Sequence, residues 1–366
     1  MFRSLSLLTL GVCLALGTSF RSATAAELFG LSPGAVEFKS VGPMAFGPSG
    51  VLFVGDPKAA KVYAINTNDK KMSAEVTYEI EDFGTACAKA SGAEEVTIAD
   101  LIVNPETGNA FASLSAGDEF AIIKVTPDGS LTPLELKKIG HSSVTLPEPP
   151  EDKLVKRRRR SVNARDSSIT DLAYMSGRVL VSGLAAGDSP SSVREFDFPF
   201  NEKANGFRVE IFHGAHGQNE DHAPIQTFVP FNIGGEPSLL AGYVCTPLVK
   251  IPVTGIEEGG KVKGTTVAEL GNRNRPLDMI VYQQDGAHYL LLANSDRGVM
   301  KITTENIAEN QGLNERVGRG ETAGQTYDTI DDLQGVVQLD KLDDGHALVL
   351  MGQTGGPLAL RSVDLP

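Results

Sequence analysis

One strand pattern recurs six times along the 366-residue chain, and this recurrence limits the possible folds more than any other feature. Each copy has an apolar run, a short turn rich in Gly or Asp, a second apolar run, a polar loop and a third, alternating run. Alternation and β-branched residues are typical of strands, and Gly/Asp turns are typical of hairpins. The first runs of the copies lie within Gly42–Asp56, Ala99–Pro105, Thr170–Tyr174, Gln226–Phe231, Leu277–Val281 and Gly335–Leu339.

A fourth, more polar strand follows five of the six copies, in the segments Ala74–Ile80, Leu134–Lys138, Phe207–Phe212, Thr265–Leu270 and Thr326–Ile330. The sixth copy has no such segment before Pro366, but a similar one, Ala35–Ser40, stands alone before the first copy. Repeats that cannot bury their own faces must pack against neighbours, and a ring provides neighbours for all of them. The sequence therefore predicts an all-β, six-bladed β-propeller closed by an N-terminal strand, Ala35–Ser40, that completes the last blade.

The first 26 residues have the features of a secretory signal peptide. Arg3 is a basic start, Leu5–Leu16 is almost wholly apolar, and Ala23-Thr-Ala25 offers a cleavage site of small residues. We expect a secreted or periplasmic protein in which residues 27–366 form a single propeller domain. Two cysteines remain after cleavage, Cys87 and Cys245, and their spacing does not decide between a disulfide and two free thiols.

The charge of the chain is a sum of unlike parts. The net charge is −13, and loss of Arg3 and Arg21 with the signal peptide makes it −15, which argues against nucleic-acid binding. Within an inserted loop, residues 140–168, the stretch Lys153–Arg165 instead carries seven basic residues and no acid. We expect a solvated loop there, and the alternative is a contact with an acidic surface, a lipid or a polyanion.

The first copy resembles the repeats of the NHL and SMP-30/gluconolactonase-like six-bladed propellers. The similarity rests on Gly42–Asp56 and Lys61–Ile65, and the later copies match in strand pattern alone. It implies the same fold, and the SMP-30-like branch implies a metal-assisted hydrolase. The Glu and Asn/Asp set that holds the metal in that family does not align here, and propellers host many functions.

Long loops fall on one face of the predicted ring. The segments Asp82–Thr97, Gly140–Ser168 and His213–Ala223 lead into inner strands, whereas the opposite turns, such as Ala173–Arg178 and Gln283–His288, are short. Loops on a rigid scaffold are where binding residues usually lie. We therefore expect the loop-decorated face to be the functional one.

Three predicted inner strands carry an aspartate at the same repeat position: Asp100, Asp171 and Asp278. Inner strands line the central channel, so these carboxylates should converge near its mouth, where like charges raise a pKa or recruit a cation. Oxygen donors on flexible loops suit Ca²⁺. The competing interpretation is that each aspartate caps its own turn through backbone amides. Neighbouring loops offer further polar side chains in Asp56, Asn294 and Asp296.

The same face collects histidines and arginines. The histidines are His141, His213, His216 and His222. Imidazoles bind Zn²⁺, Cu²⁺ or iron, but the segment around His213 lacks a predicted strand or helix to fix ligand geometry, so a solvated loop is the other interpretation. The arginines are Arg273, Arg275 and Arg297. They suit a carboxylate or phosphate ligand, and equally they could pair with the three aspartates.

Two functions fit these features. The first is a non-catalytic, monomeric propeller that binds a small ligand or a protein partner on the loop-decorated face. The alternative is a lactonase-like hydrolase in which Asp100, Asp171 and Asp278 hold a Ca²⁺-like cation that polarises a carbonyl and a water, with a loop histidine as base. A quinone-dependent sugar oxidase on a similar ring is a weaker third hypothesis.

Overall fold

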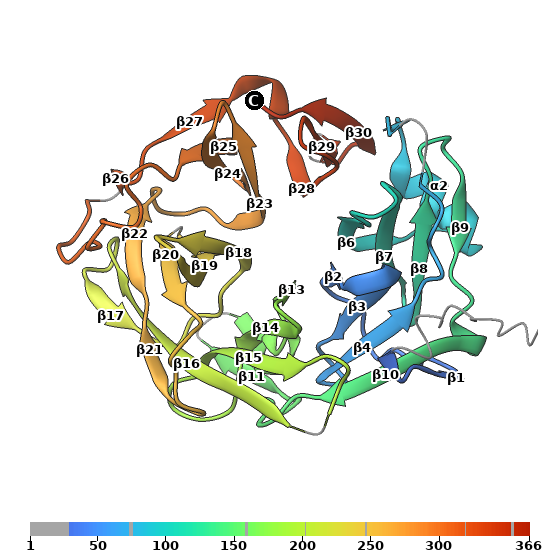
Figure 1. Ribbon diagram of the computed structural model, residues 1–366, viewed down its shortest axis with the longest axis horizontal. Helices are drawn as coiled ribbons and strands as arrows, with labels where there is room; N and C mark the ends of the chain where they lie inside the picture. Colours follow the sequence, from blue (N-terminus) through green and yellow to red (C-terminus); the bar gives the residue numbers. More distant parts are fainter. Residues whose placement is uncertain are drawn as a thin grey trace, which may run out of the picture.

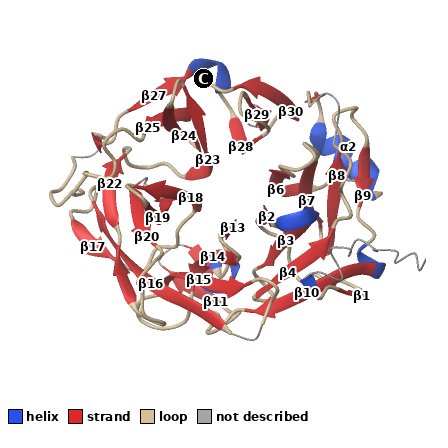
Figure 2. Cartoon of the chain, viewed as in Figure 1, coloured by secondary structure: helices blue, strands red, loops and turns tan. Residues whose placement is uncertain are grey.

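Six sheets stand around a central channel, and in each of them the consecutive blade strands pair antiparallel (Figure 1). The computed structural model describes residues 29–72, 76–157, 160–201, 203–245, 247–318, 320–352 and 355–366, so the predicted signal peptide lies outside the described residues. Within these ranges no helix is long and apolar enough to cross a membrane. Figure 2 shows that strands dominate the ring. The predicted six-bladed β-propeller is confirmed, and it agrees with the fold that the NHL and SMP-30-like resemblance implies.

We number the blades 1 to 6 by the order of their inner strands in the chain. The strands that line the channel are β2 (Met44–Phe46), β6 (Thr97–Val103), β13 (Asp171–Met175), β18 (Thr227–Ile233), β23 (Pro276–Gln284) and β28 (Val336–Lys341). The second strands are β3 (Val51–Asp56), β7 (Ala110–Ala116), β14 (Arg178–Leu184), β19 (Glu236–Gly242), β24 (Ala287–Asn294) and β29 (His346–Gly352). The third strands are β4 (Lys61–Asn66), β8 (Glu119–Val125), β15 (Ser191–Asp197), β20 (Pro247–Pro252), β25 (Gly298–Thr303) and β30 (Leu358–Asp364).

The outer strands of the blades vary widely in length, from the two residues of β5 to the ten of β16. The fourth strands are β10 (Ile139–Thr145), β9 (Leu131–Pro133), β16 (Ala204–His213), β22 (Thr265–Glu269), β27 (Tyr327–Ile330) and β5 (Glu79–Ile80). Further edge strands are β1 (Ser32–Gly34), β17 (Gln218–Glu220), β21 (Lys261–Lys263) and β26 (Ala323–Gly324). The helices are α2 (Phe83–Ser91) and the short 3₁₀ turns η1 (Pro48–Gly50), η2 (Leu136–Lys138), η3 (Ala164–Ser167) and η4 (Asp331–Leu333).

The second strands read as unbroken apolar runs because both of their faces are covered. All six residues of β3 are buried, and Leu290 to Asn294 of β24 are buried as well. A strand between two packed faces has no polar side to alternate with. These runs were therefore the clearest sequence signal for the blades.

The order of blades around the ring differs from their order in the chain. On β8, Ile122 packs in a core with Val54 of blade 1, while its neighbour Ile123 packs with Leu350 of blade 6. On β3, Phe53 packs with Val181 of blade 3. Successive side chains of a strand point to opposite faces. Blade 2 therefore lies between blades 6 and 1, and the ring runs 1, 3, 4, 5, 6, 2 (Figure 1).

Two outer strands are exchanged to allow this order. An N-terminal strand does complete the last blade, as predicted, but it is β5, which pairs with β30 through Leu360↔Ile80 and Arg361↔Glu79. The assignment of Ala35–Ser40 to this position was wrong: that segment is not a strand, and Val36 packs in the core between blades 1 and 2. The assignment of Ala74–Ile80 to blade 1 was wrong as well. Its place is taken by β10, from the predicted 140–168 insertion.

Buried side chains hold the exchanged segment in place. Tyr78 is 2% exposed, and its hydroxyl donates to the carbonyl of Gly108 at 2.7 Å and accepts from the amide of Ala110 at 3.0 Å. Phe83 and Cys87 of α2 join the same core between blades 2 and 6. Cys87 and Cys245 are both free, which answers the open question about a disulfide.

Cross-linking can test the exchanged closure. In a Cys87→Ala/Cys245→Ser background, Glu79→Cys/Arg361→Cys should form a disulfide, because side chains of directly opposed strand residues lie within about 4.5–5.5 Å. Non-reducing peptide mapping by mass spectrometry would report the link. The matched pair Lys39→Cys/Arg361→Cys, which tests the strand expected from sequence, should stay reduced. A linked Lys39 pair with a reduced Glu79 pair would contradict this topology.

Candidate functional site

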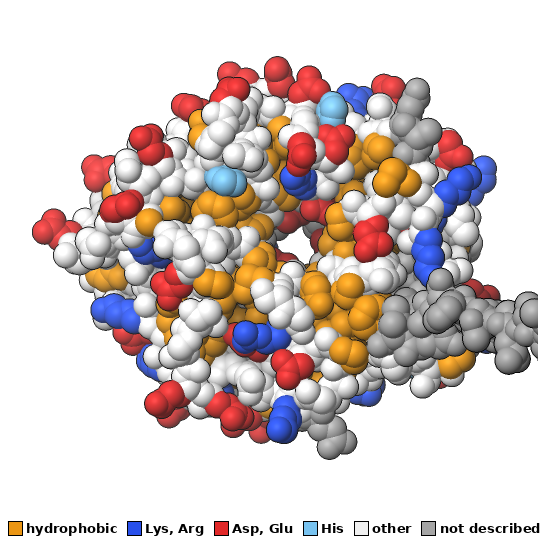
Figure 3. Space-filling view, viewed as in Figure 1, with side chains coloured by type: hydrophobic (Ala, Val, Ile, Leu, Met, Phe, Trp, Pro, Cys, Tyr) orange, Lys and Arg blue, Asp and Glu red, His pale blue; other side chains and the backbone are white. Residues whose placement is uncertain are grey.

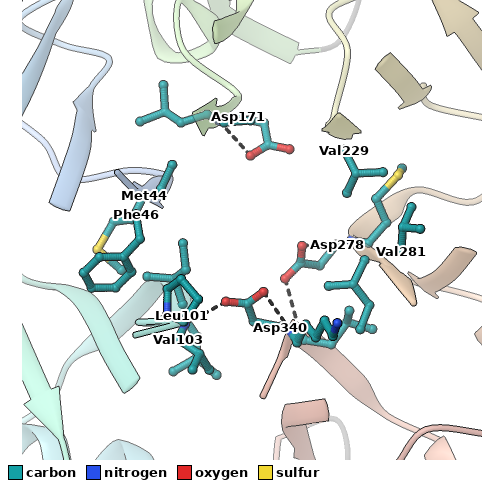
Figure 4. Close-up of a pocket in the computed structure, with 18 of the residues that line it drawn as sticks. Met44, Phe46, Leu101, Val103, Asp171, Val229, Asp278, Val281 and Asp340 are labelled. Atoms are coloured by element: carbon teal, nitrogen blue, oxygen red, sulfur yellow. Dashed lines mark hydrogen bonds between the residues drawn. The ribbon is translucent and has the colours of Figure 1, made fainter. Parts of the chain in front are cut away.

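The central channel contains a cavity of about 520 Å³. Figure 4 shows Asp171, Asp278 and Asp340 pointing into it, and Figure 3 shows apolar side chains around the central hollow on the face viewed. A second cavity of about 460 Å³ continues toward the loops that lead into the inner strands. Its lining shares Asp100, Asp171 and Asp278 with the first cavity, so these three side chains stand where the two meet. The apolar part of the lining includes Met44, Phe46, Leu101, Val103, Val229 and Val281.

Each of four channel aspartates links its own blade to the next one. The shared pattern is a carboxylate oxygen that accepts from a backbone amide on the inner strand of the neighbouring blade. The pairs are Asp100 with Met44 N at 2.6 Å, Asp171 with Phe228 N at 2.7 Å, Asp278 with Leu339 N at 2.9 Å and Asp340 with Val103 N at 2.7 Å. All four links run in the same direction around the ring.

The second oxygen of three of these carboxylates accepts from the amide of the following residue. The distances are 2.7 Å for Asp171 with Leu172, 2.8 Å for Asp278 with Met279 and 2.7 Å for Asp340 with Lys341. Backbone capping is therefore part of what these side chains do. The competing interpretations overlap, because the same carboxylates cap amides and line the cavity.

Sequence reasoning missed Asp340. In the last blade, β28 has an irregularity in its register between Val336 and Gln338. The same kind of irregularity precedes Asp100 and Asp278, and it makes Gln338 their equivalent. Residues two apart in a strand share a face, so Asp340 faces the channel as Gln338 does, two residues further along β28. This alternation in the sequence could have indicated that Asp340 lines the channel.

The channel carboxyl groups hold protons more tightly than free aspartates do. Burial raises the pKa of Asp171 to about 7 and that of Asp340 to about 6, although the amide hydrogen bonds oppose this. Burial also raises the pKa of Asp100 and of Asp278 well above the usual range, and the charges of neighbouring carboxylates add to the effect. The cavity therefore contains acids that remain partly protonated near neutral pH.

In the part of the chain that the structure describes, Asp100, Asp171 and Asp278 do not form a group whose ligand atoms all lie within 4.8 Å of one another. Ca²⁺ takes six to eight oxygen ligands at about 2.3–2.6 Å. Among the described residues, the group of three acidic, His or Cys side chains with ligand atoms within 4.8 Å of one another is His213, His216 and Glu220, outside the channel. A Ca²⁺ ion would need most of its oxygen ligands from carboxylates that already accept from backbone amides.

Of the other predicted polar residues, Arg275 alone joins the aspartates. It lines the second cavity, and its guanidinium donates to Gln226 Oε1 at 3.2 Å. Arg273 is exposed and lies outside the lining of both cavities. Asp56 is fully buried and accepts from Lys39 N at 2.7 Å and Ser40 N at 3.0 Å, and it lies outside the lining of both cavities.

Asn294, Asp296 and Arg297 stabilise the turn between β24 and β25. Asn294 Oδ1 accepts from Asp296 N at 3.0 Å and from Arg297 N at 3.2 Å. None of the three lines the channel cavities. Their contacts close the hairpin between the second and third strands of blade 5.

The four histidines that sequence analysis named as candidate site residues lie away from the channel. His141 is on β10 at the outer edge of blade 1, with Nδ1 3.1 Å from the carbonyl of Ile139. His213 and His216 belong to the β16–β17 hairpin at the outer rim of blade 3, and His222 follows it (Figure 1). The structure thus separates the histidines from the aspartates that sequence analysis placed on one face.

The basic stretch forms a hairpin where we expected a solvated loop. Strands β11 (Leu154–Arg157) and β12 (Arg160–Asn163) pair with each other, and residues 158–159 lie outside the described residues. Its base is held by Asn163, which donates to Asp152 at 2.6 Å. Leu154, Val155 and Val162 are exposed, so the hairpin presents apolar as well as basic side chains to solvent.

No protein-family model matches the sequence. The curated proteins give no match either. Solved structures similar to this one include a chain of the mitotic checkpoint complex, with 10% identity, a TM-score of 0.40, and coverage of 97% of this chain and 99% of that chain. A putative oxidoreductase (glucose dehydrogenase) from Thermus thermophilus has 11% identity and a TM-score of 0.37, with coverage of 91% and 99%. The PQQ-bound aldose sugar dehydrogenase from Streptomyces coelicolor has 9% identity and a TM-score of 0.34, with coverage of 91% and 96%. Scores this low carry no argument about function.

A pH series can test the protonated channel. Asp171 has a pKa of about 7 in the folded protein, against about 3.9 for an unfolded aspartate. Between these values the unfolded chain has released a proton that the folded chain keeps, so the contribution of Asp171 to stability falls as pH rises from about 4 to about 7. Asp171→Asn cannot titrate, so its Tm relative to wild type should increase across this window and level off above it.

Thermal melts followed by circular dichroism at stepped pH would measure this difference. Asp118→Asn, in the exposed β7–β8 turn, is the matched control and should follow wild type at every pH. Parallel curves for wild type and Asp171→Asn between pH values of about 4 and 7 would contradict the raised pKa.

Proposed function

We propose that this protein is an exported β-propeller that binds a small organic cation in its central channel without transforming it. The observation that carries the proposal is the lining of the 520 Å³ cavity, where apolar side chains surround four carboxyl groups with raised pKa values. A largely apolar cavity with a few convergent polar groups of perturbed pKa is the usual form of a ligand site.

The chemistry of the lining favours a ligand with one positive charge and an apolar portion. A cation near Asp171 and Asp278 would stabilise their ionised forms, so binding would displace protons into solvent. Met44, Phe46 and Val281 would cover the hydrocarbon part of the ligand. Both parts of such a molecule would leave water on binding. The positive charge would pair with the ionised carboxylates, which offsets the cost of burying both charges.

Calorimetry with matched probes tests this proposal. Primary alkylammonium salts should bind more tightly than alcohols of the same chain length, by about tenfold or about 1.4 kcal/mol. Because binding displaces protons, the measured enthalpy for the ammonium salts should change with the ionisation enthalpy of the buffer. Asp278→Asn should weaken ammonium binding, whereas Asp118→Asn in the exposed turn should leave it unchanged.

The same protein samples can distinguish this proposal from the metal-assisted hydrolase. If Ca²⁺ raises Tm and the ammonium salts do not, and if Asp278→Asn abolishes the Ca²⁺ effect, the metal-assisted hydrolase becomes the better account. If the alcohols bind as tightly as the ammonium salts, the carboxyl groups are not the recognition elements. If neither ammonium salts nor Ca²⁺ binds, the channel is structural and a protein partner on the loop face becomes the leading hypothesis.

A further inference from the structure

A second cluster of polar side chains lies at the outer rim of blade 3, outside the channel. Strands β16 and β17 pair as an antiparallel hairpin, with His213 opposite Gln218 and Ile211 opposite Glu220. His213 ends β16, Glu220 ends β17, and His216 lies in the turn between them. The hairpin thereby brings together three side chains spread over eight residues.

The ligand atoms of His213, His216 and Glu220 lie close enough together to bind one metal ion. Glu220 lies between the imidazoles, with Oε2 2.9 Å from His213 Nδ1 and Oε1 2.6 Å from His216 Nδ1. The two imidazole rings are 4.0 Å apart between centroids. One ligand atom from each residue falls within 4.8 Å of the others. His222, which follows the hairpin, is not part of this group.

The backbone of the turn is fixed rather than free. His213 O accepts from His216 N at 3.1 Å and from Gly217 N at 2.8 Å. The carboxylate of Glu269, on the neighbouring strand β22, accepts from Ala215 N at 3.2 Å. Sequence analysis found no register to fix ligand geometry here, and the hairpin together with Glu269 supplies it.

Burial gives the cluster a closed side and an open side. The side chains of His213 and Glu220 are 6% and 5% exposed, whereas that of His216 is 51% exposed. His213 Nε2 is buried, and no described residue pairs with it. A buried imidazole nitrogen without a partner is unusual in a folded protein, and here it belongs to a residue that already faces two other potential ligands.

We propose that His213, His216 and Glu220 form a binding site for Zn²⁺ or a similar late first-row transition metal. Two imidazole nitrogens and one carboxylate oxygen are a donor set that such ions take, with the remaining position left to water. The half-exposed His216 marks the side from which the ion would enter. Bonds of about 2.0–2.1 Å in a tetrahedral arrangement need ligand atoms about 3.3 Å apart, so Glu220 would draw back slightly from both rings.

This site is independent of the proposed channel function, and untagged, EDTA-treated protein can test it. Titration with Zn²⁺ should show one ion per chain and an increase in Tm, because the ion binds the folded state. Co²⁺ should give the visible absorption bands of a tetrahedral site. His216→Ala should weaken Zn²⁺ binding by about tenfold or more, and His222→Ala is the matched control that should retain wild-type affinity.

Two further variants make the result decisive. Glu220→Gln keeps the shape of the side chain and should also lose Zn²⁺ binding, which separates ligation from a folding defect when its far-UV circular dichroism matches wild type. Asp100→Asn/Asp278→Asn should bind Zn²⁺ normally. The proposal is overturned if wild type binds no Zn²⁺, if His216→Ala and Glu220→Gln bind it as wild type does, or if the channel variant loses it.

Discussion

Every blade of this ring depends on its neighbours for a core, because alternate side chains of each strand pack on opposite sides. Ile122 and Ile123 serve blade 1 and blade 6 respectively, and Phe53 and Val54 divide in the same way between blades 3 and 2. A sheet of this kind has no stable existence alone. The blades must therefore close into a ring, and the exchanged strands β5 and β10 are the means by which this chain closes it.

The channel aspartates combine two roles that usually conflict. Their links to neighbouring amides hold adjacent inner strands together, yet burial and mutual repulsion keep their pKa values high. An unpaired buried carboxylate is costly, and a protonated one avoids most of that cost. Under the proposed function, Asp171 and Asp278 would be largely protonated without a ligand and would ionise when a positive group binds.

Sequence alone predicted the parts of the fold that depend on local pattern. The second strands, such as Val51–Asp56, are apolar because they are covered on both faces. Asp100, Asp171 and Asp278 occupy the same position in their repeats, so they could be found by aligning the copies. The outer strands are different. Glu79–Ile80 is two residues long, and its partner Leu360–Arg361 lies far along the chain, so nothing local indicates which blade it joins. The His213–His216 cluster was similarly hidden, because Glu220 reaches it through a polar hairpin and Glu269 fixes it from another blade.

The exchange at β5 has a consequence for the order of events during synthesis. The strand that β5 joins, β30, lies almost 280 residues further along the chain, so the edge at Glu79 and Ile80 has no partner until β30 has been synthesised. Contacts between such distant segments form slowly because the loop between them must first be closed. Tyr78 and Phe83, whose burial needs blades 2 and 6 together, stay accessible over the same interval. Closure of this ring therefore depends on a pairing between an early and a late strand, and a nascent chain that stalls before β30 would expose an unpaired strand edge beside two aromatic side chains.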